Sequence, residues 1–204
     1  MNLPLPIKKQ QAGVSILELM IATAILGILI SVAIPSFSNA GDAQRLVGAT
    51  EQLYSQIQQA RSESIAGNVT GYINFNAPVA PAATSATWQY GVSSVNSLCT
   101  LTITDPTTAG ACVIVVDNGD GVTTTADYIL SRFPSTDWTD VKMGIGSFSS
   151  ATTQIVFDPV RGTSTSGQIR LESGQGKLLR IDVSLLGRPT ICSPDGSVTG
   201  YKTC

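Results

Sequence analysis

The segment that decides the fold is residues 14–37, VSILELMIATAILGILISVAIPSF, in which Glu18 is the only charged residue. A helix of this length rises about 36 Å, which is enough to cross the roughly 30 Å hydrocarbon core of a bilayer. Lys8 and Lys9 precede the segment, and such a basic flank favours a cytoplasmic N-terminus with the remainder of the chain outside. The pattern therefore predicts a single membrane-spanning helix over residues 14–37.

Glu18 separates this segment from three ordinary kinds of apolar helix. A secretory signal has an apolar core of only about 7–15 residues, followed by a cleavage site with small residues. A plain membrane anchor fits the length, but a carboxylate inside the hydrocarbon costs several kcal/mol and is normally avoided. A buried helix of a globular protein explains neither the length nor the preceding lysines. The carboxylate needs an explanation of its own.

The N-terminus resembles the signal of type IV prepilins and type II secretion pseudopilins. In that family a short basic leader ends in Gly, a prepilin peptidase cuts after it, and the new N-terminus is methylated. The resemblance implies a leader over residues 1–13, a cut between Gly13 and Val14, and N-methylation of Val14. Glu18 then becomes the fifth mature residue, as in the family. One departure is that the usual first mature residue is Phe, whereas here it is Val.

The same resemblance gives Glu18 a physical role. A buried terminal amine and a buried carboxylate are each costly alone, but they can neutralise one another between neighbouring subunits and so fix the axial register of packed helices. Gly27 and Pro35 weaken the helix locally, since glycine has low helix propensity and proline removes one backbone donor. We therefore expect these two positions to allow bending or partial melting during assembly.

Residues 38–68 continue the helix in amphipathic form, with apolar side chains at helical spacing. The helix is predicted to end near Gly67 and Asn68, which form a typical C-terminal signal. Within it, ARSESIAGN (residues 60–68) resembles the end of the long helix in the FimT/FimU/GspH branch of pilin-like proteins.

Short β-like runs separated by turn residues predict a β-rich head over residues 69–204. The closing section, residues 155–192, resembles the end of FimT/FimU/GspH proteins, with a turn at Arg161 and Gly162, and Gly187 and Arg188 ahead of a cysteine. The implied fold is α+β and type IV pilin-like, with a long N-terminal helix packed on an antiparallel β-sheet head. The expected strands cover residues 71–75, 88–92, 98–103, 113–116, 128–133, 154–157, 167–171 and 177–183.

Four cysteines, all in the head, predict two disulfides, because an even number of cysteines without CxxC spacing is typical of exported domains. Three connectivities are possible, and the simplest is the local one, which pairs Cys99 with Cys112 and Cys192 with Cys204. Each such bridge adds about 2–3 kcal/mol of stability by restricting the unfolded chain.

Catalysis and metal binding find little support in the sequence. Histidine is absent, and we find neither a phosphate-binding loop nor a nucleophile paired with a base. We therefore expect a protein that is not an enzyme and has no cofactor. Asp117, Asn118 and Asp120 lie in DNGDG, which is a weak calcium candidate because the distant ligands of an EF-hand are missing. A tight turn between strands is the preferred interpretation of this motif.

Charge is distributed unevenly along the chain. Residues 39–154 carry four basic and nine acidic side chains, whereas residues 155–204 carry six basic and four acidic ones. Some FimT-type minor pilins bind DNA through Gly-Arg-x-Arg near this end, which makes Arg188, Arg180 and Lys202 candidate phosphate contacts. Thr190 stands here in place of the second arginine. A solvated hairpin of mixed charge is therefore the preferred interpretation.

The resemblance implies a minor pilin that helps to prime assembly of a type IV pilus and lies at or near its tip. Its expected partners are other minor and major pilins, the prepilin peptidase and the inner-membrane assembly platform. The protein is expected to cross the inner membrane once, with its head in the periplasm, before it enters an extracellular pilus. Two alternatives remain: a DNA-binding subunit for natural transformation, and a pseudopilin of a type II secretion system in a periplasmic pseudopilus.

Overall fold

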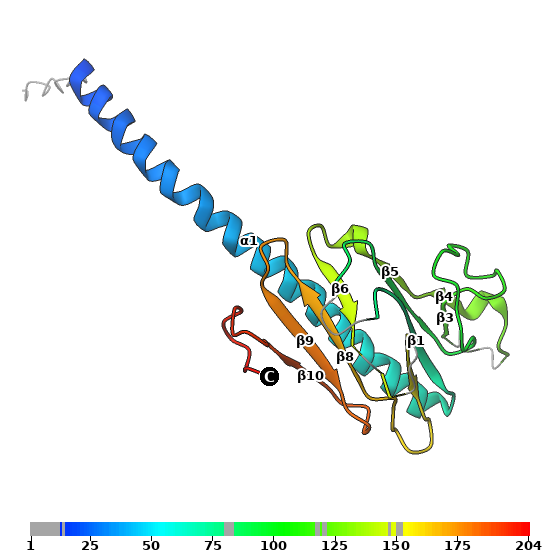
Figure 1. Cartoon of the computed structure of the whole chain (residues 1–204). Coiled ribbons are helices and arrows are strands. Elements are labelled where there is room, and N and C mark those ends of the chain that lie inside the picture. Colours follow the sequence, from blue (N-terminus) through cyan, green and yellow to red (C-terminus); the bar gives the residue numbers. More distant parts are fainter. Residues whose placement is uncertain are drawn as a thin grey trace, which may run out of the picture. The chain divides into compact units, whose positions relative to one another are not determined.

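The structure is a computed structural model that describes residues 13, 15–79, 84–116, 119, 122–146, 148–149 and 153–204, without the side chains of residues 32–37. The chain divides into two compact units, Met1–Ala40 and Gly41–Cys204. Helix α1 (Ile16–Gly67) contributes residues to both units, and all the strands belong to the second (Figure 1).

The part of α1 in the second unit is amphipathic, as predicted. One stripe of this helix is buried, and its members recur every three or four residues, which is the spacing of a single helix face. Asn68 adopts a positive φ of 49° directly after the last turn, and Val69 N donates to Ser64 O at 3.1 Å. The predicted helix end is therefore confirmed. The stripe consists of Leu46, Ala49, Leu53, Ile57 and Ala60.

Helix α1 continues through Gly27 and Pro35, so neither residue ends it. Their predicted effect during assembly stays a prediction. The membrane span expected over residues 14–37 includes Val14 and the side chains of residues 32–37, which lie outside the described part of the chain. Within the described part, no helix combines the length and the apolar character needed to cross a membrane.

The head contains two antiparallel four-stranded sheets and a two-stranded ribbon within the described residues. The first sheet has the order β5 (Arg132–Pro134), β2 (Gln89–Ser93), β1 (Gly71–Asn76) and β7 (Gln154–Phe157). The second has the order β10 (Pro189–Cys192), β9 (Leu178–Val183), β8 (Gly167–Glu172) and β6 (Lys142–Ile145). The ribbon pairs β3 (Val113–Val115) with β4 (Tyr128–Leu130), and short 3-10 helices cover Thr125–Asp127 and Ser135–Asp137.

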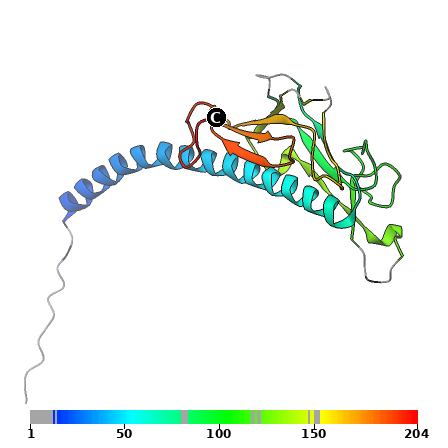
Figure 2. The same cartoon turned by 90° about the horizontal axis from the view of Figure 1, so that it is seen from below.

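The core of the head lies between the buried stripe of α1 and the inner faces of both sheets, which lie on one side of the helix (Figure 2). Alternate residues of β8 and β9 point inward, as expected for strands with one solvated face. Burial of each large apolar side chain contributes about 1.5–3 kcal/mol. The fully buried sheet residues include Ile73, Ile155, Phe157, Ile169, Leu171, Leu179 and Ile181.

Several strand predictions differ from the structure. The predicted strand over residues 98–103 is wrong, because Thr100 N donates to Gly110 O and Ile103 N to Thr100 O, so that this segment is a series of turns. The predicted strand over residues 128–133 is two strands, divided at Ser131, whose N–H donates to Cys112 O. Strands β6 and β10 were not predicted, since they are short and contain Gly144 and Pro189, which disfavour strands.

We expect Gly48→Ala to lower the free energy of unfolding by about 1–3 kcal/mol, because it overpacks the contact between α1 and Trp138. A Cβ at residue 48 would lie 2.7 Å from two atoms of the indole ring, which Gln52 holds in place by accepting from Trp138 Nε1 at 2.6 Å. Urea denaturation of the detergent-solubilised chain, followed by tryptophan fluorescence, measures the change.

Gly41→Ala is the matched control, because it lies on the same helix and a Cβ there meets no atom of the described part of the chain within 4 Å. It is expected to raise the free energy of unfolding by up to about 1 kcal/mol through helix propensity alone. Equal stabilisation by both substitutions would show that the Trp138 contact is not tight.

Candidate assembly and binding sites

The described side chains of the N-terminal unit present an exposed apolar helix surface. Glu18 lies in the first turn of α1, where its carboxylate also interacts favourably with the positive end of the helix dipole. Ile16 is 80% exposed, and every large apolar side chain described between residues 16 and 30 is likewise exposed. So much apolar surface requires lipid or other subunits to cover it. The exposed set is Ile16, Leu17, Leu19, Met20, Ile21, Ile25, Leu26, Ile28, Leu29 and Ile30.

Part of the predicted processing site lies outside the described residues. Gly13 is described and exposed, whereas Val14 and the remainder of the leader are not described. The cut after Gly13 and the methylation of Val14 therefore stay predictions. The weak calcium candidates Asp117, Asn118 and Asp120 also lie outside the described residues.

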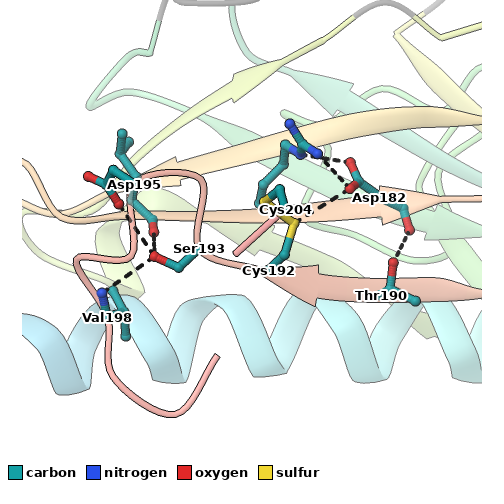
Figure 3. The surroundings of a disulfide bond; sticks show 9 residues. Asp182, Thr190, Cys192, Ser193, Asp195, Val198 and Cys204 are labelled. Atoms are coloured by element: carbon teal, nitrogen blue, oxygen red, sulfur yellow. Dashed lines mark hydrogen bonds and ion pairs between the residues drawn. A yellow bond between two sulfur atoms is a disulfide. The ribbon is translucent and has the colours of Figure 1, made fainter. Parts of the chain in front are cut away.

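Both disulfides join cysteines that are close in sequence. Cys99 and Cys112 are bonded, with their Cα atoms 4.8 Å apart, and so are Cys192 and Cys204, at 5.0 Å. The prediction of two disulfides is confirmed, and the pairing is the local one. The first bridge closes the turns that follow residue 98, and the second ties the C-terminal residue to β10 (Figure 3).

The C-terminal bridge lies beside an ion pair on the outer face of the second sheet (Figure 3). Arg180 Nε contacts Asp182 Oδ1 at 2.8 Å, and Asp182 Oδ2 lies 3.5 Å from the sulfur of Cys192. Asp182, Cys192 and Cys204 are therefore close enough to suggest a metal site. However, the disulfide occupies both sulfurs, and metal coordination requires thiolates. This cluster is structural.

The C-terminal segment is also held against α1. The hydroxyl of Tyr201 donates to Glu51 Oε1 at 2.7 Å. Burial raises the pKa of Tyr201 to about 12, and the hydrogen bond to the Glu51 carboxylate adds to the shift. The phenol therefore stays protonated at physiological pH and keeps donating, so this contact and the Cys192–Cys204 bridge anchor the last residues together.

The three candidate DNA contacts do not form a single cluster. Arg180 stands opposite Cys192 in the β9–β10 pair and is occupied by Asp182. Arg188 is exposed and precedes Pro189 at the opposite end of β10, roughly 13 Å along the strand from Cys192. Lys202 is exposed, and its carbonyl accepts from Ser193 N directly after β10. Arg188 is thus separated from the other two by the length of the strand.

Instead, the two turns singled out in the sequence meet at Arg61 of α1. Arg61 Nε donates to the carbonyl oxygen of Gly162 at 3.1 Å. Gly162 and Gly187 have positive φ angles of 62° and 69°, which favour glycine. A Cβ at Gly187 would lie 2.8 Å from Arg61 Nε, so this backbone can approach the arginine only as glycine. Arg61 was not among the residues predicted from the sequence, although its place within residues 60–68 was a signal.

Asp158 shapes the first of these turns. Its Oδ1 accepts from Arg161 N at 3.0 Å and from Val160 N at 2.8 Å. These hydrogen bonds, the one from Arg161 first, hold the pKa of the Asp158 carboxyl below its usual range. The carboxylate is therefore ionised at neutral pH and supports the backbone that presents Gly162 O to Arg61.

A pocket of about 330 Å³ lies next to Arg61, between α1 and the turn that joins β9 to β10. Two arginines, Arg61 and Arg188, are among its lining residues, and neither forms an ion pair with a described residue. As far as the described residues define it, the lining contains no acidic side chain. Its members are Tyr54, Gln58, Arg61, Ser62, Gly187, Arg188 and Pro189.

Comparison with known families accounts for both the N-terminal segment and the head. A family model described as type II transport protein GspH matches residues 49–187, which is more than half of the chain. The chain belongs to the GspH family. A second model, described as the prokaryotic N-terminal methylation motif, matches residues 8–34. No curated protein and no solved structure gives a significant match.

As a GspH-family protein, the chain is type IV pilin-like and of the pilin or pseudopilin class. The predicted fold class is confirmed, since the long helix α1 packs on antiparallel sheets. The methylation motif implies a subunit anchored in the inner membrane that is assembled into a pilus or a pseudopilus. Family membership also suggests contacts with other pilins and with the prepilin peptidase.

Because all four cysteines are bonded, a maleimide reagent should label none of them in the exported protein before reduction and all four afterwards. Peptide mass spectrometry under non-reducing conditions should find Cys99 linked to Cys112. A peptide that links either of them to the C-terminal pair would contradict the local pairing. Replacing Cys192 and Cys204 with Ser is expected to lower the free energy of unfolding by about 2–3 kcal/mol.

Proposed function

We propose that this protein is a minor subunit of a type IV pilus that helps to prime assembly and lies at or near the pilus tip. The role is structural and not enzymatic. The subunit enters the filament through the helix of its N-terminal unit, after cleavage behind Gly13 and methylation of Val14. The head then makes specific contacts with other minor and major pilins.

One observation carries the proposal: an apolar helix surface, exposed over the residues that the structure describes, that holds Glu18 in its first turn. Lipid could cover the apolar side chains, but it would leave the carboxylate unpaired, at a cost of several kcal/mol. The terminal amine of an adjacent processed subunit supplies the missing positive charge. The match to the methylation motif supports such processing, because its residues 8–34 include Gly13, Val14 and Glu18.

A type II secretion pseudopilus is the second candidate, and the description of the matched GspH family favours it. The two machines assemble related helical filaments, so the fold supports both. Deletion of the gene distinguishes them by phenotype. Loss of surface pili with normal secretion supports the pilus, whereas periplasmic retention of secreted proteins with normal pili supports the pseudopilus.

Glu18→Ala is expected to reduce incorporation into filaments about tenfold or more, because breaking one side of a buried ion pair costs about 3–5 kcal/mol. Quantitative immunoblotting of sheared filaments measures the incorporation. Mass spectrometry of the variant should still show a mature chain that starts at Val14, since the peptidase acts before assembly.

Glu63→Ala is the matched control on the same helix, where the Glu63 carboxylate accepts a hydrogen bond from Gln59 Nε2, four residues earlier. This variant should assemble normally. Normal incorporation of the Glu18 variant would contradict the ion-pair role, and retention of Met1 in the wild type would contradict the pilin hypothesis itself.

DNA binding, the third candidate, rests on the exposed Arg188 beside Gly187. Mobility-shift assays with a short duplex and the full chain in non-ionic detergent test it. We expect no shift that depends on Arg188, because Asp182 occupies Arg180 and Thr190 replaces the second arginine. A shift at low salt that Arg188→Ala abolishes and Arg161→Ala preserves would establish the DNA-binding function instead.

A further inference from the structure

The geometry points to the pocket between Arg61 and Arg188 as a docking site for a carboxylate on a partner subunit of the same filament. The inference deepens the proposed function, on which the identity of the partner rests. The presence of the anion pocket itself does not depend on that function.

Arg61 is positioned in advance for such a ligand. Its Nε is engaged by the carbonyl oxygen of Gly162 at 3.1 Å, which fixes the plane of the guanidinium. The backbone of Gly187 packs against the same side chain, since a Cβ there would lie 2.9 Å from Arg61 Cδ. No described residue pairs with Arg61 through an ion pair. The terminal nitrogens of a fixed guanidinium form the fork that binds carboxylates with two hydrogen bonds.

Arg188 supplies a second positive charge to the same pocket. Two arginines in the lining of a pocket of about 330 Å³ favour a compact anion and disfavour a cation. Gln58 also lines the pocket and is exposed, so its side-chain amide is accessible as a neutral donor. Ser62 contributes less, because its hydroxyl already donates to Gln59 O at 2.8 Å.

Exposed apolar side chains around this pocket favour a protein ligand over a nucleic acid. Leu185 and Leu186 precede Gly187 in its turn and are 61% and 63% exposed. Val160 is exposed in the other turn and shares an open groove of about 620 Å³ with Leu185. Ile65 is half exposed, and its Cδ1 would lie 3.1 Å from a Cβ at Gly162. Protein interfaces combine apolar contacts with arginine anchors, whereas a phosphate backbone would leave these side chains uncovered.

The first experiment tests the pocket on the full chain in non-ionic detergent, labelled with ¹⁵N at arginine. Sodium acetate replaces sodium chloride stepwise at constant ionic strength, and the chemical shift of the Arg61 Nε–Hε resonance is followed. The expected result is a saturable shift with acetate. Arg188→Gln should weaken the apparent affinity about tenfold or more, because it removes a charge-assisted hydrogen bond. Arg161→Gln removes the same charge from a residue outside the pocket lining and should change little.

The second experiment tests the partner in cells that assemble the filament. A photocrosslinking residue, p-benzoyl-phenylalanine, replaces Leu186 in the full chain, because this side chain is exposed beside the pocket and outside its lining. The adducts are analysed by mass spectrometry. The expected adduct joins another prepilin-type subunit through a peptide that contains Asp or Glu. Arg188→Gln should abolish this adduct, and Arg161→Gln should preserve it.

Different failures lead to different conclusions. An identical response to acetate and chloride, or an unchanged affinity after Arg188→Gln, overturns the carboxylate pocket while filament incorporation still stands. Adducts with DNA, or no adduct from protein that is present in filaments, overturn the choice of partner. Absence of the chain from filaments contradicts the proposed function, and the acetate titration then still reports on the pocket.

Discussion

Burial of one stripe of α1 is the interaction on which the head depends. The side chains from Leu46 to Ala60 pack against both four-stranded sheets, and neither sheet has another described helix of comparable length to cover it. An isolated sheet with an open apolar face is unstable in water. The two sheets therefore fold only when this helix covers their apolar faces. The head therefore cannot form without the second half of the same helix whose first half matches the methylation motif.

The two parts of α1 could be recognised from the sequence because each has its own apolar pattern. Residues 14–37 are apolar on all sides, whereas the following residues show apolar positions at helical spacing. The helix end at Gly67 and the exact bounds of β7, Gln154–Phe157, were likewise predictable, since strong local signals mark them. Prediction failed where local composition and tertiary contacts disagree. Residues 98–103 have strand-like composition, but the Cys99–Cys112 bridge and the turns it closes prevent extended pairing.

The candidate pocket shows a different limit of sequence analysis. The turns at Gly162 and Gly187 were visible as short motifs, and Arg61 lay inside a third. Nothing in a single sequence shows that these three segments, separated by more than a hundred residues at the extremes, meet at one guanidinium. Charge counting pointed to Arg180 and Lys202 as well, but Arg180 is occupied by Asp182 in the folded sheet. The register of β9 and β10 shows that Arg188 lies at the opposite end of β10 from Arg180 and Lys202.

These features suggest a division between affinity and selectivity in assembly. Apolar packing of the N-terminal helix is strong but non-directional, so it cannot distinguish one pilin-like partner from another. In the proposed assembly, the carboxylate of Glu18 adds register, because an unpaired charge in an apolar setting penalises every misaligned neighbour. Register alone does not distinguish between subunits that share the same N-terminal motif. In the proposed assembly, selection among them comes from the head, where the guanidinium of Arg61 disfavours any surface that brings no anion to it.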